Sequence, residues 1–238
     1  MIVHSHKEAI PASVIRVEQN NILRLLGIPE GRADEYVIGI VHSVLQKCHE
    51  ICAPQIVYTI YDNPVFLLGS GEMKVGELVF ALNKMVTAAL ARSSSVAFFI
   101  GTCGDQIEKY SKTLMRDGNT LESLIADFAG SEMAECIAEY AHNKIEKDAA
   151  RQGLLITNRY SPGYCNWPVS DQQKVFLLMQ PETCGVTLTT SSLMLPVKSV
   201  SGITGLGKSV TKSDYACARC EMDHCLYRDK NRKTDARH

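Results

Sequence analysis

The decapeptide Met133-Ala-Glu-Cys-Ile-Ala-Glu-Tyr-Ala-His142 has the spacing of apolar and charged residues that is typical of an amphipathic helix. Its apolar stripe consists of Met133, Cys136 or Ile137, Tyr140 and Ile145. A second face carries polar residues at steps of four, three and four, namely Glu135, Glu139, His142 and Glu146. Two interpretations of this face stay open: a hydrated acidic surface, or the wall of a site for a cationic ligand.

Outward from this decapeptide, we expect one long helix over about residues 120–150, with a break at Gly130-Ser131 where Ser131 acts as the N-cap. The apolar periodicity predicts further helices over residues 17–26, 33–52, 83–92 and 105–115. Runs typical of strands cover residues 56–61, 65–68, 96–100, 187–190 and 199–204. Because the strands and helices do not alternate regularly, we expect an α+β domain rather than a doubly wound sheet.

The composition is that of an ordinary globular protein, with 238 residues of which 45% are hydrophobic and 21% are charged. The formal net charge of −1 gives no basic field that favours nucleic acid or an anionic membrane. No apolar segment approaches the roughly 20 residues that span a bilayer, and the N-terminus lacks the apolar core of a signal peptide. We therefore expect a cytoplasmic protein without nucleic-acid or membrane partners.

The segment Arg159-Tyr160-Ser161-Pro162-Gly163-Tyr164 is the main candidate for a binding loop. Pro162 fixes its own φ, and Gly163 permits a backbone conformation or a close approach that other residues do not. Arg159 can bind a carboxylate through two parallel hydrogen bonds, and Tyr164 offers a flat face and a hydroxyl. Composition alone favours a small-molecule site and a plain core-packing turn equally.

Three blocks of this sequence resemble the activation (reactivation) domain of cobalamin-dependent methionine synthase. The helix Met133 to His142 matches the family pattern L-A-E-x-x-A-E-x-x-H, and the loop R-Y-S-P-G-Y matches R-P-A-P-G-Y. Downstream, M-L-P-V-K-S-V-S-G, Met194 to Gly202, resembles M-W-P-G-x-S-V-S-G. The blocks occur in the family's order and cover about residues 101–207, whereas the N-terminal third follows the pattern only loosely.

The resemblance implies a single α+β domain with a central, largely antiparallel twisted sheet, several long helices and an S-adenosylmethionine site. Arg159 would hold the methionine carboxylate, Glu135 the amino group, and Tyr164 with the Ser161 to Gly163 backbone the nucleoside. Opposite charges on a helix and a facing loop also suit the zwitterionic aminoacyl end of this ligand.

The resemblance further implies a component of methionine synthase activity rather than a complete enzyme. Its function would be the reductive methylation, or reactivation, of cob(II)alamin on a methionine synthase or related corrinoid methyltransferase. The electron would come from a flavodoxin- or ferredoxin-type donor. Since no D-x-H-x-x-G cobalamin motif and no homocysteine or folate module precedes the three blocks, we expect the corrinoid protein to be supplied in trans.

Two departures from the family pattern bear on the site. The family's P-A-C-P-x-H after the tyrosine is replaced by a segment one residue longer and without histidine, Cys165-Asn-Trp-Pro-Val-Ser-Asp171. The tyrosine that follows S-V-S-G in the family has no clear counterpart, because Tyr215 is too far along the chain.

The segment Gly202 to Ser209 fits the pattern G-x-x-x-x-G-K-S of nucleotide-binding P-loops. A P-loop must end a strand and open a helix, but the residues after Ser209 lack helical periodicity. We therefore interpret the segment as part of a strand.

The nine cysteines are odd in number and spread along the chain, which does not suggest a secreted disulfide framework. Cys48 and Cys52 lie one helical turn apart and are interpreted as buried thiols.

We expect a domain over residues 1–212 and a Cys-rich basic tail over residues 213–238. In this tail Cys217, Cys220 and Cys225 have the spacing of zinc or iron–sulfur ligands, with His224, Cys165 or Cys103 as a fourth; free thiols are the alternative. The rival function is a metal-containing interaction or electron-transfer module that does not bind S-adenosylmethionine.

Overall fold

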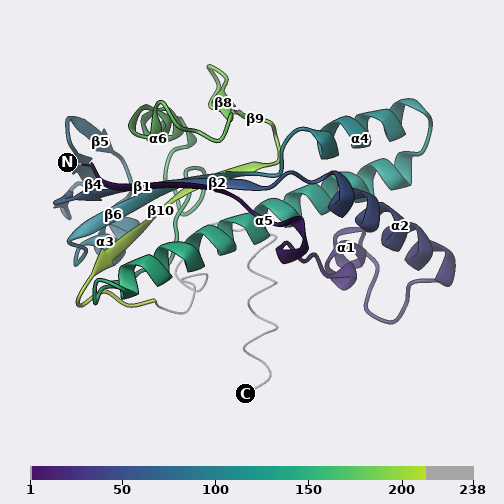
Figure 1. Cartoon of the computed structure of the whole chain (residues 1–238), viewed down its shortest axis with the longest axis horizontal. Coiled ribbons are helices and arrows are strands. Elements are labelled where there is room, and N and C mark those ends of the chain that lie inside the picture. The colour runs from purple at the N-terminus through teal and green to yellow at the C-terminus, as the bar shows by residue number, and fades with distance from the viewer. Residues whose placement is uncertain (1, 213–238) are drawn as a thin grey trace.

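The centre of the molecule is a five-stranded antiparallel sheet with the strand order β1-β2-β6-β10-β7. The computed structural model describes residues 2–212. The strands span Ile2–Ala9 (β1), Gln55–Asp62 (β2), Ser95–Thr102 (β6), Leu155–Ile156 (β7) and Ser199–Gly207 (β10). Every residue of β6 is buried, because layers of structure cover both faces of the sheet (Figure 1). This explains why its sequence is a continuous apolar run rather than an alternating one.

One face of the sheet is covered by a layer of helices. The longest is α5 (Thr120–Ala150), which runs along the sheet and continues beyond its end (Figure 1). There it packs against α2 (Glu35–Ile51) and α4 (Gln106–Arg116), and the short α1 (Gln19–Leu25) lies beside α2. A 3₁₀ turn, Ala12–Val14, connects β1 to this helical layer.

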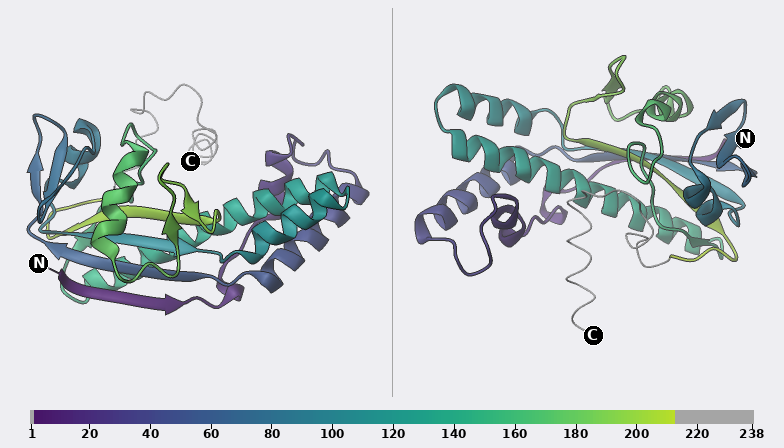
Figure 2. Two further views of the ribbon diagram at one scale, coloured as in Figure 1. Left: turned by 90° about the horizontal axis from the view of Figure 1, so that it is seen from above. Right: turned by 180° about the vertical axis from the view of Figure 1, so that it is seen from behind.

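The opposite face is covered by smaller elements (Figure 2). The helices here are α3 (Lys84–Leu90) and α6 (Gln172–Met179), the latter preceded by a 3₁₀ turn, Val169–Asp171. A small antiparallel sheet consists of β3 (Val65–Leu67), β4 (Glu72–Val75) and β5 (Leu78–Phe80). A two-stranded ribbon pairs β8 (Thr187–Leu188) with β9 (Met194–Leu195). The sheet therefore separates two hydrophobic cores.

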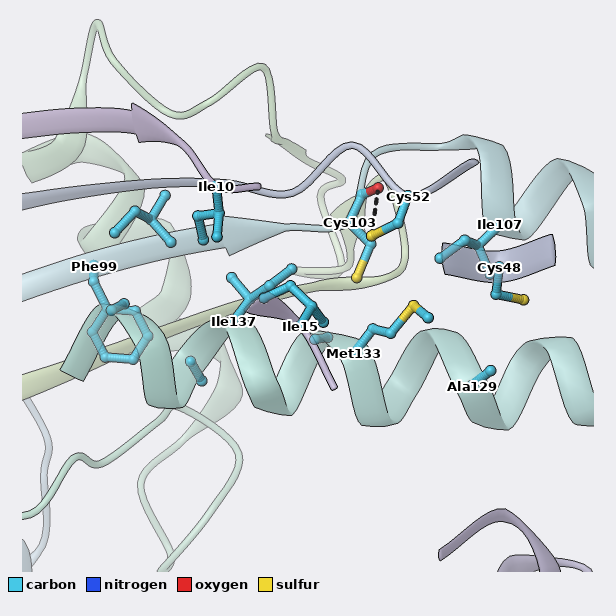
Figure 3. Close-up of a cluster of buried hydrophobic side chains, with 14 of the residues drawn as sticks. Ile10, Ile15, Cys48, Cys52, Phe99, Cys103, Ile107, Ala129, Met133 and Ile137 are labelled. Atoms are coloured by element: carbon cyan, nitrogen blue, oxygen red, sulfur yellow. Dashed lines mark hydrogen bonds between the residues drawn. The ribbon is translucent and has the colours of Figure 1, made fainter. Parts of the chain in front are cut away.

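The helix-side core brings α5 against the central strands, with Phe99, Met133 and Ile137 fully buried (Figure 3). Cys48 and Cys52 are buried in the same core, which confirms their interpretation as thiols of the interior. Burial raises the pKa of Cys48 to about 12, and the thiol of Cys52 donates a hydrogen bond of 3.8 Å to the carbonyl oxygen of Cys103 (Figure 3). These sulfurs pack as small apolar groups.

The break that we expected at Gly130-Ser131 is wrong, because α5 is one uninterrupted helix of 31 residues. Ser131 is not an N-cap; its hydroxyl donates to the carbonyl oxygen of Asp127, one turn earlier, at 3.2 Å. Gly130 is present for close packing: a Cβ atom there would lie 2.9 Å from Cγ of Lys198 and 3.0 Å from Ile107. The glycine lets neighbouring segments cross the helix closely and does not end it.

The other predicted elements exist with shifts of a few residues at their ends, and the α+β class with an antiparallel sheet is confirmed. The sequence analysis missed β1, the β4–β5 hairpin, β7, β9 and α6. Among the described helices, none is long and apolar enough to cross a membrane.

Candidate functional site

A cleft of about 300 Å³ lies where α5, the loop after β7 and the start of β10 meet. From α5 it is lined by Ser131, Ala134 and Glu135, and from the loop by Arg159, Ser161, Pro162 and Tyr164. The segment from β9 into β10 completes it with Met194 and residues 197–201. The three blocks that are far apart in the sequence thus converge on one site, which includes the predicted residues Glu135, Arg159, Ser161 and Tyr164.

The Arg159 guanidinium forms ion pairs with two carboxylates on successive turns of α5. Its Nη2 lies 2.9 Å from Oε2 of Glu135, and its Nη1 lies 2.6 Å from Oε2 of Glu139. The arginine side chain is 16% exposed, against 54% for that of Glu139. A cation of the facing loop therefore pairs with this part of the acidic face of α5, although Glu139 stays more than half exposed to solvent.

The loop is held against β10 by backbone hydrogen bonds. The Tyr160 amide donates to the Ile203 carbonyl at 2.9 Å, and the Ile203 amide donates back to Tyr160 at 2.8 Å. Upstream, the Thr157 amide donates to the Gly205 carbonyl at 2.9 Å. This extended pairing fixes the position of the chain on either side of Arg159, so that its side chain reaches α5.

The turn after Arg159 is held by a hydrogen bond to Trp167, the only tryptophan of the sequence. The Tyr164 amide donates to the Ser161 carbonyl at 3.1 Å, and Gly163, with φ of 91°, donates to the Trp167 carbonyl at 2.8 Å. Trp167 is 1% exposed and donates through Nε1 to the buried carboxylate of Asp171 at 3.0 Å. The aromatic residues of this loop therefore divide: Tyr164 faces the cleft, whereas Trp167 belongs to the core on the far side of the sheet. Gly163 shapes the turn without lining the cleft.

Two buried polar residues of the cleft were missed by the sequence analysis, although both lie in the third block. Lys198 has a side chain that is 7% exposed, and Ser201 is 2% exposed. Within the described part of the chain, the Ser201 hydroxyl has no hydrogen-bond partner. A buried hydroxyl left unpaired beside a cleft is costly unless a ligand or water completes it.

His142, the last residue of the decapeptide, is 4% exposed and lies outside the cleft. Its Nε2 is 2.9 Å from the Thr157 carbonyl oxygen, which can only accept, so the ring carries its proton on Nε2. Burial lowers the pKa of His142 below its ordinary value. This histidine connects α5 to the start of the loop rather than acting in the site.

The other motifs supply no second site in the described residues. Residues 202–207 belong to β10, which pairs with β6 and β7, so the P-loop pattern lacks the strand–loop–helix geometry that it needs. No group of three or more His, Cys, Asp or Glu side chains between residues 2 and 212 is placed to hold a metal ion. Cys103 is fully buried, and the predicted ligands Cys217, Cys220 and Cys225 lie outside the described residues.

Comparison with known proteins agrees with this arrangement. The family model described as "Vitamin B12 dependent methionine synthase, activation domain" matches residues 66–233. Among solved structures, the MetH reactivation domain bound to AdoHcy is similar, with a TM-score of 0.60 and 14% sequence identity over 88% of this chain and 80% of that chain. At this identity the structural likeness shows a common fold.

The fold and the cleft define a class of protein: an α+β domain in which a long helix, a loop and a sheet strand enclose a cleft. The match over well over half of the sequence makes the assignment specific. The chain belongs to the family of vitamin B12-dependent methionine synthase activation domains.

Proposed function

We propose that the chain binds S-adenosylmethionine in this cleft and thereby supports the reductive methylation of cobalamin on a methionine synthase or related corrinoid protein. The observation that carries the proposal is the meeting of Glu135 and Arg159 at the wall of the cleft, 2.9 Å apart. The similar MetH domain is described as bound to AdoHcy, which has the same aminoacyl and nucleoside groups.

The two charges suit the aminoacyl end of the ligand. Arg159 would bind the α-carboxylate, and Glu135 the α-ammonium group. Without ligand, Arg159 also binds Glu139, which does not line the cleft and is half-exposed. Glu139 can therefore release the guanidinium and become hydrated when a ligand carboxylate arrives.

The rest of the cleft suits a nucleoside. Tyr164, 45% exposed, presents an aromatic face, and Met194 and Val197 add apolar surface. The unpaired Ser201 hydroxyl and the Ser161 side of the turn offer hydrogen bonds to polar atoms of the ligand. A volume of about 300 Å³ is at the lower end of the range for small-molecule sites.

S-adenosylmethionine supplies an electrophilic methyl group when bound, and the electron would come from a flavodoxin- or ferredoxin-type donor. The residues of this chain bind and orient the methyl donor, and a partner carries the cobalamin. Tyr164 is half-exposed, so a ligand bound against it would be accessible to such a partner from the surface.

Isothermal titration with S-adenosylmethionine tests the site. We expect Arg159→Ala to weaken binding about 30-fold, because loss of a charge-assisted carboxylate contact costs about 2 kcal/mol. Glu139→Gln is the matched control: it removes the competing partner of Arg159 and should leave binding unchanged or tighter. Wild-type protein that does not bind, or binding indifferent to Arg159, would contradict the proposal.

The same variants test the reaction. Wild type, S-adenosylmethionine and a chemical reductant are added to a cobalamin-loaded methionine synthase that lacks its own activation domain, and the visible spectrum of the corrinoid is followed. We expect methylation with wild type and Glu139→Gln, and loss with Arg159→Ala. The metal-binding role of Cys217, Cys220 and Cys225 stays a prediction, and nothing in residues 2–212 favours the rival electron-transfer module.

A further inference from the structure

Lys198 is a buried cation in the wall of the cleft. Its side chain is 7% exposed, and its Nζ lies 2.6 Å from Oδ1 of Asp127 and 3.0 Å from Oγ of Ser131. Its methylene groups pack against α5 at Gly130, where a Cβ atom would collide with them. The lysine is therefore held in one position, and the family pattern, which leaves this place variable, assigns it no role.

The ammonium group has one more donor than its protein contacts use. An ammonium carries three N–H groups, and among residues 2–212 it contacts two acceptors, Asp127 and Ser131. Because Lys198 also lines the cleft, its remaining donor is available to a ligand there. An ammonium N–H without an acceptor is costly at so buried a position, which favours an acceptor on a ligand there.

Lys198 and Arg159 are attached to neighbouring turns of the same helix. Lys198 is bound at Ser131 and Arg159 at Glu135, four residues further along α5. Four residues correspond to a rise of about 6 Å. A carboxylate group that accepts one hydrogen bond at each of its two oxygens spans a gap of this size.

We propose that Lys198 is a second ligand-binding cation of the cleft, which contacts the carboxylate of the ligand from the side opposite to Arg159. This inference rests on the proposed function. It makes Lys198 a specificity-determining residue for the aminoacyl group, since two cations that converge on one carboxylate discriminate against ligands that lack it. Its partner Asp127 is 54% exposed and does not line the cleft, so it takes no direct part in this contact.

Titration with two ligands tests this role: S-adenosylmethionine, and decarboxylated S-adenosylmethionine, which lacks only the carboxylate. We expect Lys198→Met to weaken binding of the first roughly tenfold or more. Binding of the decarboxylated ligand should change by less than about twofold, because the interaction removed by the variant is absent from that complex. A general disturbance of the cleft would weaken both ligands equally, so this selective loss separates a contact from a structural role.

Asp127→Asn is the control that leaves the lysine in place, and we expect it to bind both ligands like wild type. Lys198→Met should fold, because Asp127 is 54% exposed and remains hydrated without its partner. If Lys198→Met does not fold, the double variant Asp127→Asn/Lys198→Met, which removes both charges of the pair, is used instead. Equal losses for both ligands, or no loss, overturn the inference while binding that depends on Arg159 still supports the proposed function. Failure of wild type to bind S-adenosylmethionine overturns both.

Discussion

At the scale of single residues, the cleft and its rim carry opposite charges that neutralise one another. Glu135, Glu139 and Arg159 form one such group, and Asp127 and Lys198 form a second. Each group joins α5 to a different segment of the chain. In the proposed function Arg159 exchanges its contact with Glu139 for one with a ligand carboxylate, whereas Lys198 keeps its contact with Asp127.

His142 gives a prediction about pH at this scale. Because burial lowers its pKa in the folded state, the unfolded chain binds more protons, and stability decreases as the pH falls through about 6.5. We expect the urea midpoint of wild type to fall between pH 7.5 and 5.5 more steeply than that of His142→Gln, whose amide can still donate to Thr157. The other histidines titrate alike in both proteins, so an identical pH dependence would show that His142 contributes nothing.

At the scale of elements, the candidate loop depends on a helix, α6, that does not line the cleft. Asp171, at the start of α6, accepts hydrogen bonds from Trp167 at 3.0 Å and from the backbone amide of Ala81 at 2.6 Å, and it pairs with Lys174 at 2.6 Å. Its side chain is 4% exposed. One carboxylate thus connects the loop, the small sheet and α6.

We expect Asp171→Ala to lower the free energy of unfolding by about 3 kcal/mol, because the buried indole N–H of Trp167 and the backbone N–H of Ala81 lose their acceptor. It should also weaken ligand binding, since Trp167 supports the turn that carries Tyr164. Leu177→Ala, on the same helix and 64% exposed, should change stability by less than about 0.5 kcal/mol. Urea denaturation measures both; similar stabilities of the two variants would contradict this role of Asp171.

At the scale of the whole molecule, the central sheet belongs to both cores. Met133 lies in the core between α5 and the sheet, and Trp167 lies in the core on the opposite face of the sheet. Strands β6 and β10 contribute side chains to both. A loss of packing on one face of the sheet should therefore lower the stability of the core on the other face, as expected for a single cooperative unit.

We expect Met133→Ala to destabilise the protein by about 3 kcal/mol through the cavity that it leaves. The fluorescence of Trp167, the only tryptophan in the sequence, reports on the far core, whereas far-ultraviolet circular dichroism reports mainly on the helices. Both signals should shift to the same lower urea midpoint. A fluorescence midpoint that stays at the wild-type value would mean that the two faces unfold separately.

The resemblance to a known family, rather than periodicity, predicted that Glu135 and Arg159 share one site. The sequence by itself determined the helices and strands with strong periodicity and the α+β class. These features follow from local spacing, which the chain carries directly. Weakly patterned elements such as β1 and the β4–β5 hairpin were missed, because their residues become half-buried only when other segments pack on them.

Only the tertiary structure decided which of the residues singled out in the sequence line the cleft. It placed Trp167 in the far core, showed that Gly130 allows close packing within an unbroken helix, and brought Lys198 and Ser201 to the ligand side. It also gave Arg159 a second partner in Glu139. Spacing along the chain tells which residues share a face of one element, whereas burial and charge pairing depend on what lies across from that face.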